Sequence, residues 1–254
     1  MLLERTIAHP VSVEAFLEAV VGTSFDQWQR RGKYLLVPLQ RNGCPAGYLG
    51  VHLRMTGQLL WVEQSMPLTS HCRVRLYFDD DRELRYVDQR TFGRLWWVPP
   101  DTAPETVMTG LQRLGPEPFS EEFSPDYLGR WCSRRQRPIK NALLDQMLVA
   151  GIGNIYADEA LFLSGIRPQI RCDRISRQRI VRLHAAIRQV LSDSINAGGT
   201  TFSDFRDVHG TNGNYGGVAW VYDREGQPCR RCGSEIQRLK LAGRSAHYCP
   251  SCQR

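Results

Sequence analysis

Four cysteines near the C-terminus constrain the fold of this chain more than any other feature. Cys229 and Cys232 form one C-x2-C pair, and Cys249 and Cys252 form a second pair after sixteen intervening residues. Each pair can sit on a tight turn that directs both sulfurs at one ion, and the spacing is typical of a four-thiolate zinc site. Two disulfides in a secreted protein, or four unrelated thiols, are the alternatives. We interpret the four residues as ligands of one structural Zn²⁺.

Other features argue against a secreted or membrane protein. The N-terminus lacks a basic region followed by an apolar core, and no apolar run approaches the roughly eighteen residues of a membrane span. We therefore expect a cytoplasmic protein with reduced thiols at the four remaining, scattered cysteines, and no membrane partner. The net charge of +7 and the pI near 9.1 favour a polyanionic partner.

The residues between the two cysteine pairs are expected to form a basic hairpin. Residues 237–247 read as a strand, a glycine turn and a second strand, with Lys240 and Arg244 near the tip. A module of this size cannot bury much core, so the metal would supply its folding energy. A basic loop held rigid by zinc is suited to contacting nucleic acid.

The N-terminal half has the texture of a β domain. A short helix is expected at residues 12–21, with Ser12 as its N-cap and Gly22 at its end. Short β runs separated by turn residues then follow, which is meander or sandwich spacing. These runs are residues 34–39, 48–53, 58–62, 73–78, 83–87 and 94–98.

The C-terminal half is expected to be helical after a stiff connector at residues 114–118, where we place a domain boundary. A helix beginning at Pro138 carries one apolar stripe of Ile139, Leu143, Leu144, Met147 and Leu148. Two more helices are expected, from residue 155 to about 163 and from Ser176 to the glycines at 198–199.

Two stretches in this half favour phosphate contact. The turn at residues 151–154, Gly-Ile-Gly-Asn, follows a helix and lacks the third glycine of a dinucleotide fingerprint, so that interpretation is rejected. Such a turn can instead direct backbone N–H groups at a phosphate, although it could be a plain turn between helices. The arginines of residues 134–137, with Lys140, are either a solvated face or a second phosphate contact, which we favour.

Three stretches of the β region carry further candidate residues. Lys33 is either a surface lysine or a proton-transfer amine in a cationic cleft. Two strand-end turns each place a bulky apolar residue beside an arginine and a glycine: Met55 beside Arg54, and Phe92 close to Arg90. Methionine and phenylalanine on turns are poorly placed for a core, and an apolar wedge beside an arginine suits a protein that extrudes a base from the stack.

Taken together, these motifs resemble bacterial formamidopyrimidine-DNA glycosylases. The resemblance runs in order from about Gln29 to Arg254, and Thr211–Tyr215 favours this branch over the related endonuclease VIII branch. The motifs that carry it are residues 30–34, 52–57, 88–93, 114–118, 151–159 and 198–201, together with the cysteine pairs.

The resemblance implies an α+β fold of three parts. These are an N-terminal β-sandwich at residues 1–113, a helix–two-turn–helix domain at 114–206, and a lesion loop with the zinc finger at 207–254. Duplex DNA would lie between the lobes, and the family precedent is a monomer. A cytoplasmic, nucleoid-associated bacterial repair enzyme is therefore expected.

The resemblance also implies roles for individual residues. Lys33 resembles the lysine assigned to acid catalysis of β-elimination, and Arg244 resembles the zinc-finger arginine that grips phosphates and assists δ-elimination. The remaining correspondences concern DNA contact. Met55, Arg90 and Phe92 would fill the void left by the extruded nucleotide, and His71, Arg135, Asn154 and also Arg90 would contact the DNA backbone.

The N-terminus departs from the family pattern. In the family an N-terminal proline amine is the nucleophile and a glutamate follows it, whereas this sequence opens Met-Leu-Leu-Glu-Arg. Glu4 belongs to a different segment and is not assigned the acid role. Either this sequence starts downstream of the protein's true N-terminus, or the protein is truncated; we favour the first, because losing a central helix would expose apolar surface. As given, the chain is expected to bind duplex DNA without excising bases.

The sequence therefore predicts a base-excision glycosylase and AP lyase that removes oxidised purines such as 8-oxoguanine and formamidopyrimidines from double-stranded DNA, and also acts on abasic sites. The rival hypothesis is a non-catalytic protein that binds damaged DNA or abasic sites. A zinc-ribbon RNA-binding protein is a weaker alternative, because it does not explain the wedges at Met55 and Phe92.

Overall fold

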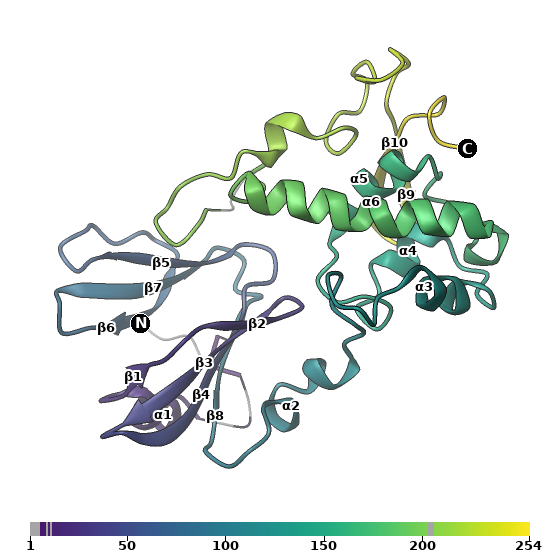
Figure 1. The fold of residues 1–254 in the computed structure, drawn as a ribbon. Coiled ribbons are helices and arrows are strands. Elements are labelled where there is room, and N and C mark those ends of the chain that lie inside the picture. The colour runs from purple at the N-terminus through teal and green to yellow at the C-terminus, as the bar shows by residue number, and fades with distance from the viewer. Residues whose placement is uncertain (1–5, 9, 11, 203–205) are drawn as a thin grey trace. The chain divides into compact units, whose positions relative to one another are not determined.

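The computed structural model describes residues 6–8, 10, 12–202 and 206–254, and the chain forms two compact units (Figure 1). The first unit comprises Met1–Arg113 and Thr200–Gly213, and the second comprises Leu114–Gly199 and Asn214–Arg254. Among the described residues, no helix is long and apolar enough to cross a membrane.

The first unit begins with a short helix, α1 (Val13–Val20). The Ser12 hydroxyl accepts a hydrogen bond from the Ala15 backbone N–H at 3.2 Å, which caps the helix as its sequence predicts. Phe16 and Val20, four residues apart, are buried on the face that meets the core.

Two antiparallel sheets make up most of the first unit. In the larger sheet the order is β1 (Ser24–Phe25), β3 (Tyr34–Arg41), β4 (Cys44–His52), β8 (Arg94–Val98), and β2 (Gln29–Arg31) also pairs with β3. The smaller sheet has the order β5 (Gly57–Glu63), β7 (Arg82–Asp88), β6 (Cys72–Tyr77). All six predicted β runs are strands.

A common core lies between these sheets and confirms the predicted β-sandwich. Val37, Leu49 and Val51 from the larger sheet belong to the same buried cluster as Val74 and Tyr86 from the smaller one. The register pairs Val37 with Leu49, so that side chains of neighbouring strands share the core face. After β8 the unit continues with α2 (Pro104–Val107) and the 3₁₀ helix η1 (Thr109–Arg113).

The second unit is a helical domain followed by a two-stranded hairpin. Its elements, in order, are α3 (Pro125–Cys132), α4 (Ile139–Leu143), α5 (Asn154–Ser164), η2 (Cys172–Arg174), α6 (Arg177–Asn196), η3 (Tyr215–Val218), β9 (Gln237–Leu241) and β10 (Arg244–Tyr248). The apolar stripe of α6, which includes Leu183 and Ile187, packs in one cluster with Ala157 and Leu161 of α5. The helix–two-turn–helix and zinc-finger parts of the predicted fold are thus present.

The helix expected from Pro138 to Leu148 is shorter than its apolar stripe predicts. It ends at Leu143, and Met147 is exposed. The following backbone is taken up by other partners: the Asp145 carboxylate accepts from the Met147 N–H at 3.0 Å, and the Gln146 carbonyl accepts from Gly115 at 2.8 Å. Local side-chain bonds of this kind compete with a helix.

Residues 200–213 group with the first unit, which differs from the predicted boundaries at residues 206 and 207. The reason is a set of hydrogen bonds to that unit and within the segment. The Trp61 N–H on β5 donates to the Val208 carbonyl at 2.7 Å, and Thr201 N–H donates to Gly213 at 3.3 Å.

Candidate functional site

The four predicted zinc ligands converge on one point. The four sulfurs all lie within 4.8 Å of one another, with Cys229 and Cys252 at 3.9 Å and Cys232 and Cys249 at 3.5 Å. A tetrahedral ion with Zn–S bonds of about 2.3 Å requires sulfur separations of about 3.8 Å. Geometry and donor type therefore both fit a structural Zn²⁺, and the cofactor prediction is confirmed.

The zinc cysteines flank a short hairpin that exposes two cations. β9 and β10 pair antiparallel, with Leu241 opposite Arg244, and the turn between them uses positive φ at Ala242 (45°) and Gly243 (79°). Lys240 and Arg244 are exposed beside this turn. The predicted hairpin and its basic tip are thus as expected from the sequence.

A buried ion pair holds this hairpin on the helices. The Lys140 ammonium of α4 lies 2.6 Å from the Asp158 carboxylate of α5, and both side chains have no solvent exposure. Lys140 also donates to the carbonyl of Ser245, the neighbour of Arg244, and the His247 N–H donates to Asp158 at 3.0 Å. Burial lowers the pKa of Lys140, and Asp158 opposes that shift. The interpretation of Lys140 as part of a surface phosphate site is wrong.

A second buried carboxylate holds the segment that leads to the finger. Glu159 of α5 accepts hydrogen bonds from three consecutive backbone N–H groups, those of Trp220, Val221 and Tyr222, at 2.7, 2.9 and 3.0 Å. Burial raises the pKa of Glu159, and these donors counteract the shift. Glu159 has no role among the sequence-based predictions, although an acidic residue in a mostly apolar helix is the signal that could have indicated one.

Asn154 begins α5, as the predicted phosphate-contact turn requires. Gly151 has a φ of +88°, and the Gln146 side chain bridges the turn by accepting from Gly151 N–H at 2.9 Å and donating to the Ile152 carbonyl at 3.0 Å. Within the described chain, the side-chain oxygen of Asn154 is buried without a hydrogen-bond partner. A buried acceptor of this kind, at a helix N-terminus, suits a bound ligand that donates or bridges through water.

Arg135 lies exposed after α3 and is held by Trp131. Its guanidinium stacks 3.8 Å from the Trp131 ring centroid and donates to the Trp131 carbonyl at 2.7 Å. Arg137 covers the same ring at 4.7 Å but pairs with Asp145 at 2.6 Å. Arg135 is thus pre-oriented with donors that can contact phosphate.

In the first unit, Lys33 lies exposed on the turn between β2 and β3, where Gly32 adopts a φ of +56°. The positive charge of Lys33 affects the pKa of His52, at the end of β4. Its pKa is lowered to about 4, mainly by burial and further by the positive charges of Arg54 and Lys33. The Arg54 N–H donates to His52 Nδ1 at 3.1 Å, so the neutral ring supports the turn that carries Met55.

This His52 shift predicts a pH dependence of stability. The unfolded chain binds a proton near pH 6.5 and the folded chain near pH 4, so stability is lost as the pH falls through that window. Between pH 7 and pH 5 the loss from this residue is about 2 kcal/mol. Urea unfolding of the wild type and of His52→Asn, which does not titrate, measures it as the difference between their pH slopes. Equal slopes would contradict the prediction; exposed His209→Asn is the matched control.

Met55 and Phe92 are both exposed, at 58% and 50%, on turns that connect the two sheets. The Arg90 guanidinium lies 4.9 Å from the Phe92 ring centroid. Large apolar side chains exposed at neighbouring turns are typical of an interaction surface.

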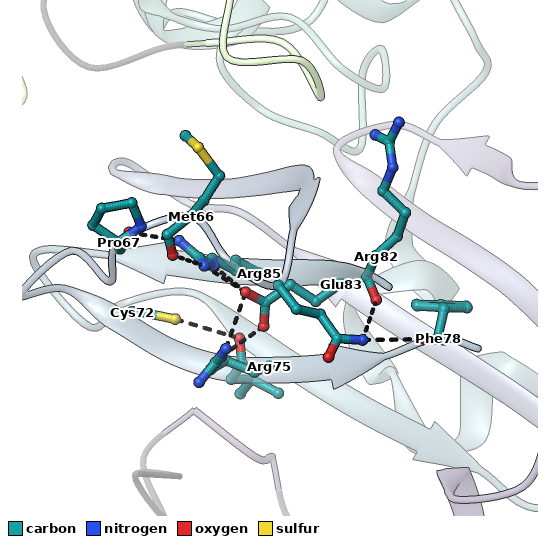
Figure 2. A network of polar contacts seen from close by, with 10 residues as sticks. Met66, Pro67, Cys72, Arg75, Phe78, Arg82, Glu83 and Arg85 are labelled. Atoms are coloured by element: carbon teal, nitrogen blue, oxygen red, sulfur yellow. Dashed lines mark hydrogen bonds and ion pairs between the residues drawn. The ribbon is translucent and has the colours of Figure 1, made fainter. Parts of the chain in front are cut away.

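His71 precedes β6, at the end of a loop. Figure 2 shows the polar network that holds the start of this loop. Glu83, fully buried, accepts from Arg75 Nε at 2.6 Å and from Arg85 Nε at 2.5 Å. Arg85 in turn donates to the Met66 carbonyl at 2.5 Å and to the Pro67 carbonyl at 2.8 Å. The network thereby fixes Met66 and Pro67, in the loop that leads to His71.

The predicted site residues fall in both units. Lys33, Met55, His71, Arg90 and Phe92 belong to the first, and Arg135, Asn154 and Arg244 belong to the second. Met1 and Glu4 lie outside the described residues, so the expectation about the N-terminal amine stays a prediction.

The chain combines a β-sandwich, a helical domain and a four-cysteine finger with exposed arginines. This combination defines a DNA-binding protein of the helix–two-turn–helix and zinc-finger class. Family models match three stretches: the formamidopyrimidine-DNA glycosylase N-terminal domain over residues 1–95, its H2TH domain over 114–206, and a zinc finger found in FPG and IleRS over 226–254. The chain belongs to the formamidopyrimidine-DNA glycosylase family.

Individual relatives agree with this assignment. The formamidopyrimidine-DNA glycosylases of Acaryochloris marina and of a Synechococcus strain are 61% and 62% identical, and each alignment covers 100% of this chain and 89% of the relative. The structure of the Thermus thermophilus MutM (FPG) protein is 39% identical with a TM-score of 0.84, over 93% of this chain and 85% of that one. A Lactococcus lactis Fpg complex with abasic-site DNA is 32% identical with a TM-score of 0.88, over 99% and 89%.

Proposed function

We propose that this chain recognises damaged DNA with the exposed residues of its two units and processes it with Lys33 and Arg244. The chain is a base-excision repair glycosylase and AP lyase that acts on double-stranded DNA with oxidised purines or abasic sites. Its relatives from Lactococcus lactis were crystallised with DNA containing Fapy-dG or an abasic site. Such chemistry requires that the damaged nucleotide leave the base stack.

Void filling is assigned to Met55, Arg90 and Phe92. The single observation that carries the proposal is the exposure of Met55 and Phe92 beside arginines on adjacent turns. An extruded nucleotide leaves a gap with apolar walls and one unpaired base. Two apolar side chains can fill that gap, and the Arg90 guanidinium can donate to the unpaired base or to the nearby backbone.

Backbone contact is assigned to His71, Arg135, Asn154 and also Arg90. Arg135 offers an oriented guanidinium, and Asn154 lies at the N-terminus of α5, where backbone N–H groups attract phosphate. Contacts of this kind would fix the register of the duplex without reading its sequence.

The strand-cleavage steps are assigned to Lys33 and Arg244. In β-elimination a proton leaves the sugar C2′ and the 3′ phosphate departs, and the Lys33 ammonium is a proton donor suited to the leaving oxygen. Arg244, at the tip of the hairpin, can hold the phosphates and stabilise their charge during δ-elimination.

The Arg244→Ala variant tests this assignment. Loss of one phosphate contact is expected to weaken binding to an abasic-site duplex about tenfold at low salt and to reduce the salt slope by about one. In a chain that carries the family's N-terminal proline, the ratio of δ- to β-elimination product should fall as well, measured by gel analysis of an abasic oligonucleotide. Arg238→Ala, on the adjacent strand and paired with Glu225 at 3.0 Å, is the control. Unchanged binding and product ratio in Arg244→Ala would refute the role.

The cellular setting follows from the substrate. We place the protein in the bacterial cytoplasm, at the nucleoid, acting as a monomer. Preferential binding to abasic duplex without any strand incision, by a chain that begins with the family's N-terminal proline, would instead support the non-catalytic binding protein.

A further inference from the structure

The two turns that carry the proposed void-filling residues are linked to each other inside the first unit. Residues 53–56 connect β4 to β5, and residues 89–93 connect β7 to β8, so both turns pass from one sheet to the other. The strands on either side are also paired, with His52 opposite Arg94 and Gly57 opposite Asp88. The turns therefore start and end as neighbours.

A buried carboxylate at the start of the second turn collects donors from both turns. Asp88 is 1% exposed and accepts from the Thr56 hydroxyl at 2.5 Å, from the Gly93 N–H at 2.8 Å and from the Tyr86 hydroxyl at 3.1 Å. Thr56 comes from the first turn, and Gly93 closes the second. An ionised carboxylate accepts several hydrogen bonds at once, and bonds to charged groups are the strong ones.

Thr56 continues this chain of bonds to the residue that bears the arginine. Its hydroxyl oxygen accepts from the Arg90 N–H at 3.0 Å while its proton goes to Asp88. A single hydroxyl next to Met55 thus holds the backbone of Arg90, two residues before Phe92. Thr56 is buried, at 9% exposure, so water does not compete freely for either bond.

The backbone of both turns is closely packed and conformationally restricted. A Cβ at Gly57 would lie 2.7 Å from the Tyr86 hydroxyl, and a Cβ at Gly93 would overlap the same atom. Each turn also holds one non-glycine residue at positive φ, Arg54 at 56° and Thr91 at 55°. Such conformations persist where the surroundings fix them, and they cluster at functional sites.

We propose that Asp88 and Thr56 are positioning residues that hold Met55, Arg90 and Phe92 as one rigid wedge, and that this rigidity sets how strongly the chain prefers damaged over intact DNA. The inference rests on the proposed void-filling role. Two independent turns would each lose conformational entropy when they enter the duplex. Linked turns are already ordered in the free protein, so this cost of binding is smaller. The gain in binding affinity arises only where the duplex has a void to fill, so it favours damaged over intact DNA.

The test uses Thr56→Val, which keeps the side-chain shape and removes both hydroxyl bonds, and Thr56→Ser, which restores them. The probe is a duplex with a tetrahydrofuran abasic analogue opposite 2-aminopurine, whose fluorescence rises when the wedge unstacks the opposite base; no catalysis is needed. Thr6→Val is the matched control, because the Thr6 hydroxyl is buried in the same unit without a hydrogen-bond partner among the described residues.

Thr56→Val is expected to lower the preference for the abasic over the intact duplex about tenfold and to reduce the 2-aminopurine rise. The reason is the loss of two hydrogen bonds, the one to the Asp88 carboxylate and the one from the Arg90 N–H. Binding to the intact duplex should change less than about twofold, because phosphate contacts dominate it. Thr56→Ser and Thr6→Val should behave as wild type. Tyr86→Phe, which removes one donor from Asp88 and leaves Thr56 intact, should give a smaller change in the same direction.

Two outcomes separate this inference from the proposed function. If the wild type shows no preference for the abasic duplex, the proposed function fails. If the wild type shows that preference and Thr56→Val retains both the preference and the fluorescence rise, the positioning role is refuted. The role is also refuted if Thr6→Val loses preference equally, because general loss of stability would then be sufficient.

Discussion

The Cys249→Ser variant is expected to lose bound zinc, unfold residues 226–254 and weaken binding to an abasic-site duplex by at least about a hundredfold. The zinc finger shares a small core with α5, in which Cys229, Ile236 and Cys249 pack against Phe162 and Val221. Metal binding to such modules contributes apparent free energies of about 10–16 kcal/mol, so a three-thiolate site leaves the fold without its main stabilisation. Arg244 then loses its fixed place on the hairpin.

Metal analysis of the purified variant, amide hydrogen exchange across residues 226–254, and duplex-binding titrations check this result. Exchange in the β strands of the first unit should be unaltered, since its core is separate from the finger. Cys44→Ser, an exposed cysteine far from the cluster in sequence, should keep zinc and affinity. A Cys249→Ser protein that retains stoichiometric zinc and full affinity would rule out the structural-zinc interpretation.

The zinc site and the sandwich could be predicted from the sequence because both depend on local spacing. Paired cysteines two residues apart specify ligand geometry without knowledge of the rest of the fold. The six β runs combine apolar alternation with turn residues, and all six form strands. The start of α1 was likewise predictable, since Ser12 caps it with its own side chain.

Helix ends in the second unit depended on longer-range partners. The stripe beyond Leu143 has helical spacing, yet its backbone bonds go elsewhere; for example, the Leu148 carbonyl accepts from the Tyr127 hydroxyl at 2.9 Å. α3 was not predicted, although Ser124 before Pro125 is a regular start signal and Ser124 accepts from the Tyr127 N–H at 3.2 Å.

The candidate site was predictable where it is exposed and not where it is buried. Met55, Phe92 and Arg244 could be identified from the sequence because they are apolar or basic residues on turns. The groups that hold them, among them Asp88 and Asp158, act through contacts 32 and 89 residues distant in sequence. An acidic residue within a strand or helix does not disclose such a partner in the sequence, and this is also why Lys140, which pairs with Asp158, was wrongly assigned to phosphate contact.

The Glu159→Ala variant is expected to destabilise the second unit by about 3–5 kcal/mol while leaving the four zinc ligands intact. Alanine leaves the N–H groups of Trp220, Val221 and Tyr222 without their acceptor in a buried site. Each unsatisfied buried donor costs about 1–3 kcal/mol, and the three are not fully additive because water can enter the space. Glu159→Gln should have an intermediate effect, because its amide nitrogen would face one of these donors.

The consequence for function follows from what the Trp220–Tyr222 segment supports. Trp220 stacks on Phe162 of α5 at 5.3 Å between ring centroids, and Arg231, between the first two zinc ligands, covers the same Phe162 ring at 4.7 Å. Releasing the segment should therefore loosen the finger against α5, and abasic-duplex affinity should fall although zinc content stays at one per chain. Denaturant unfolding, metal analysis and binding titrations of Glu159→Ala, with exposed Glu121→Ala as control, measure the three effects. If Glu159→Ala unfolds at the wild-type denaturant concentration, the three N–H groups find equivalent partners without the carboxylate, and Glu159 does not hold the finger in place.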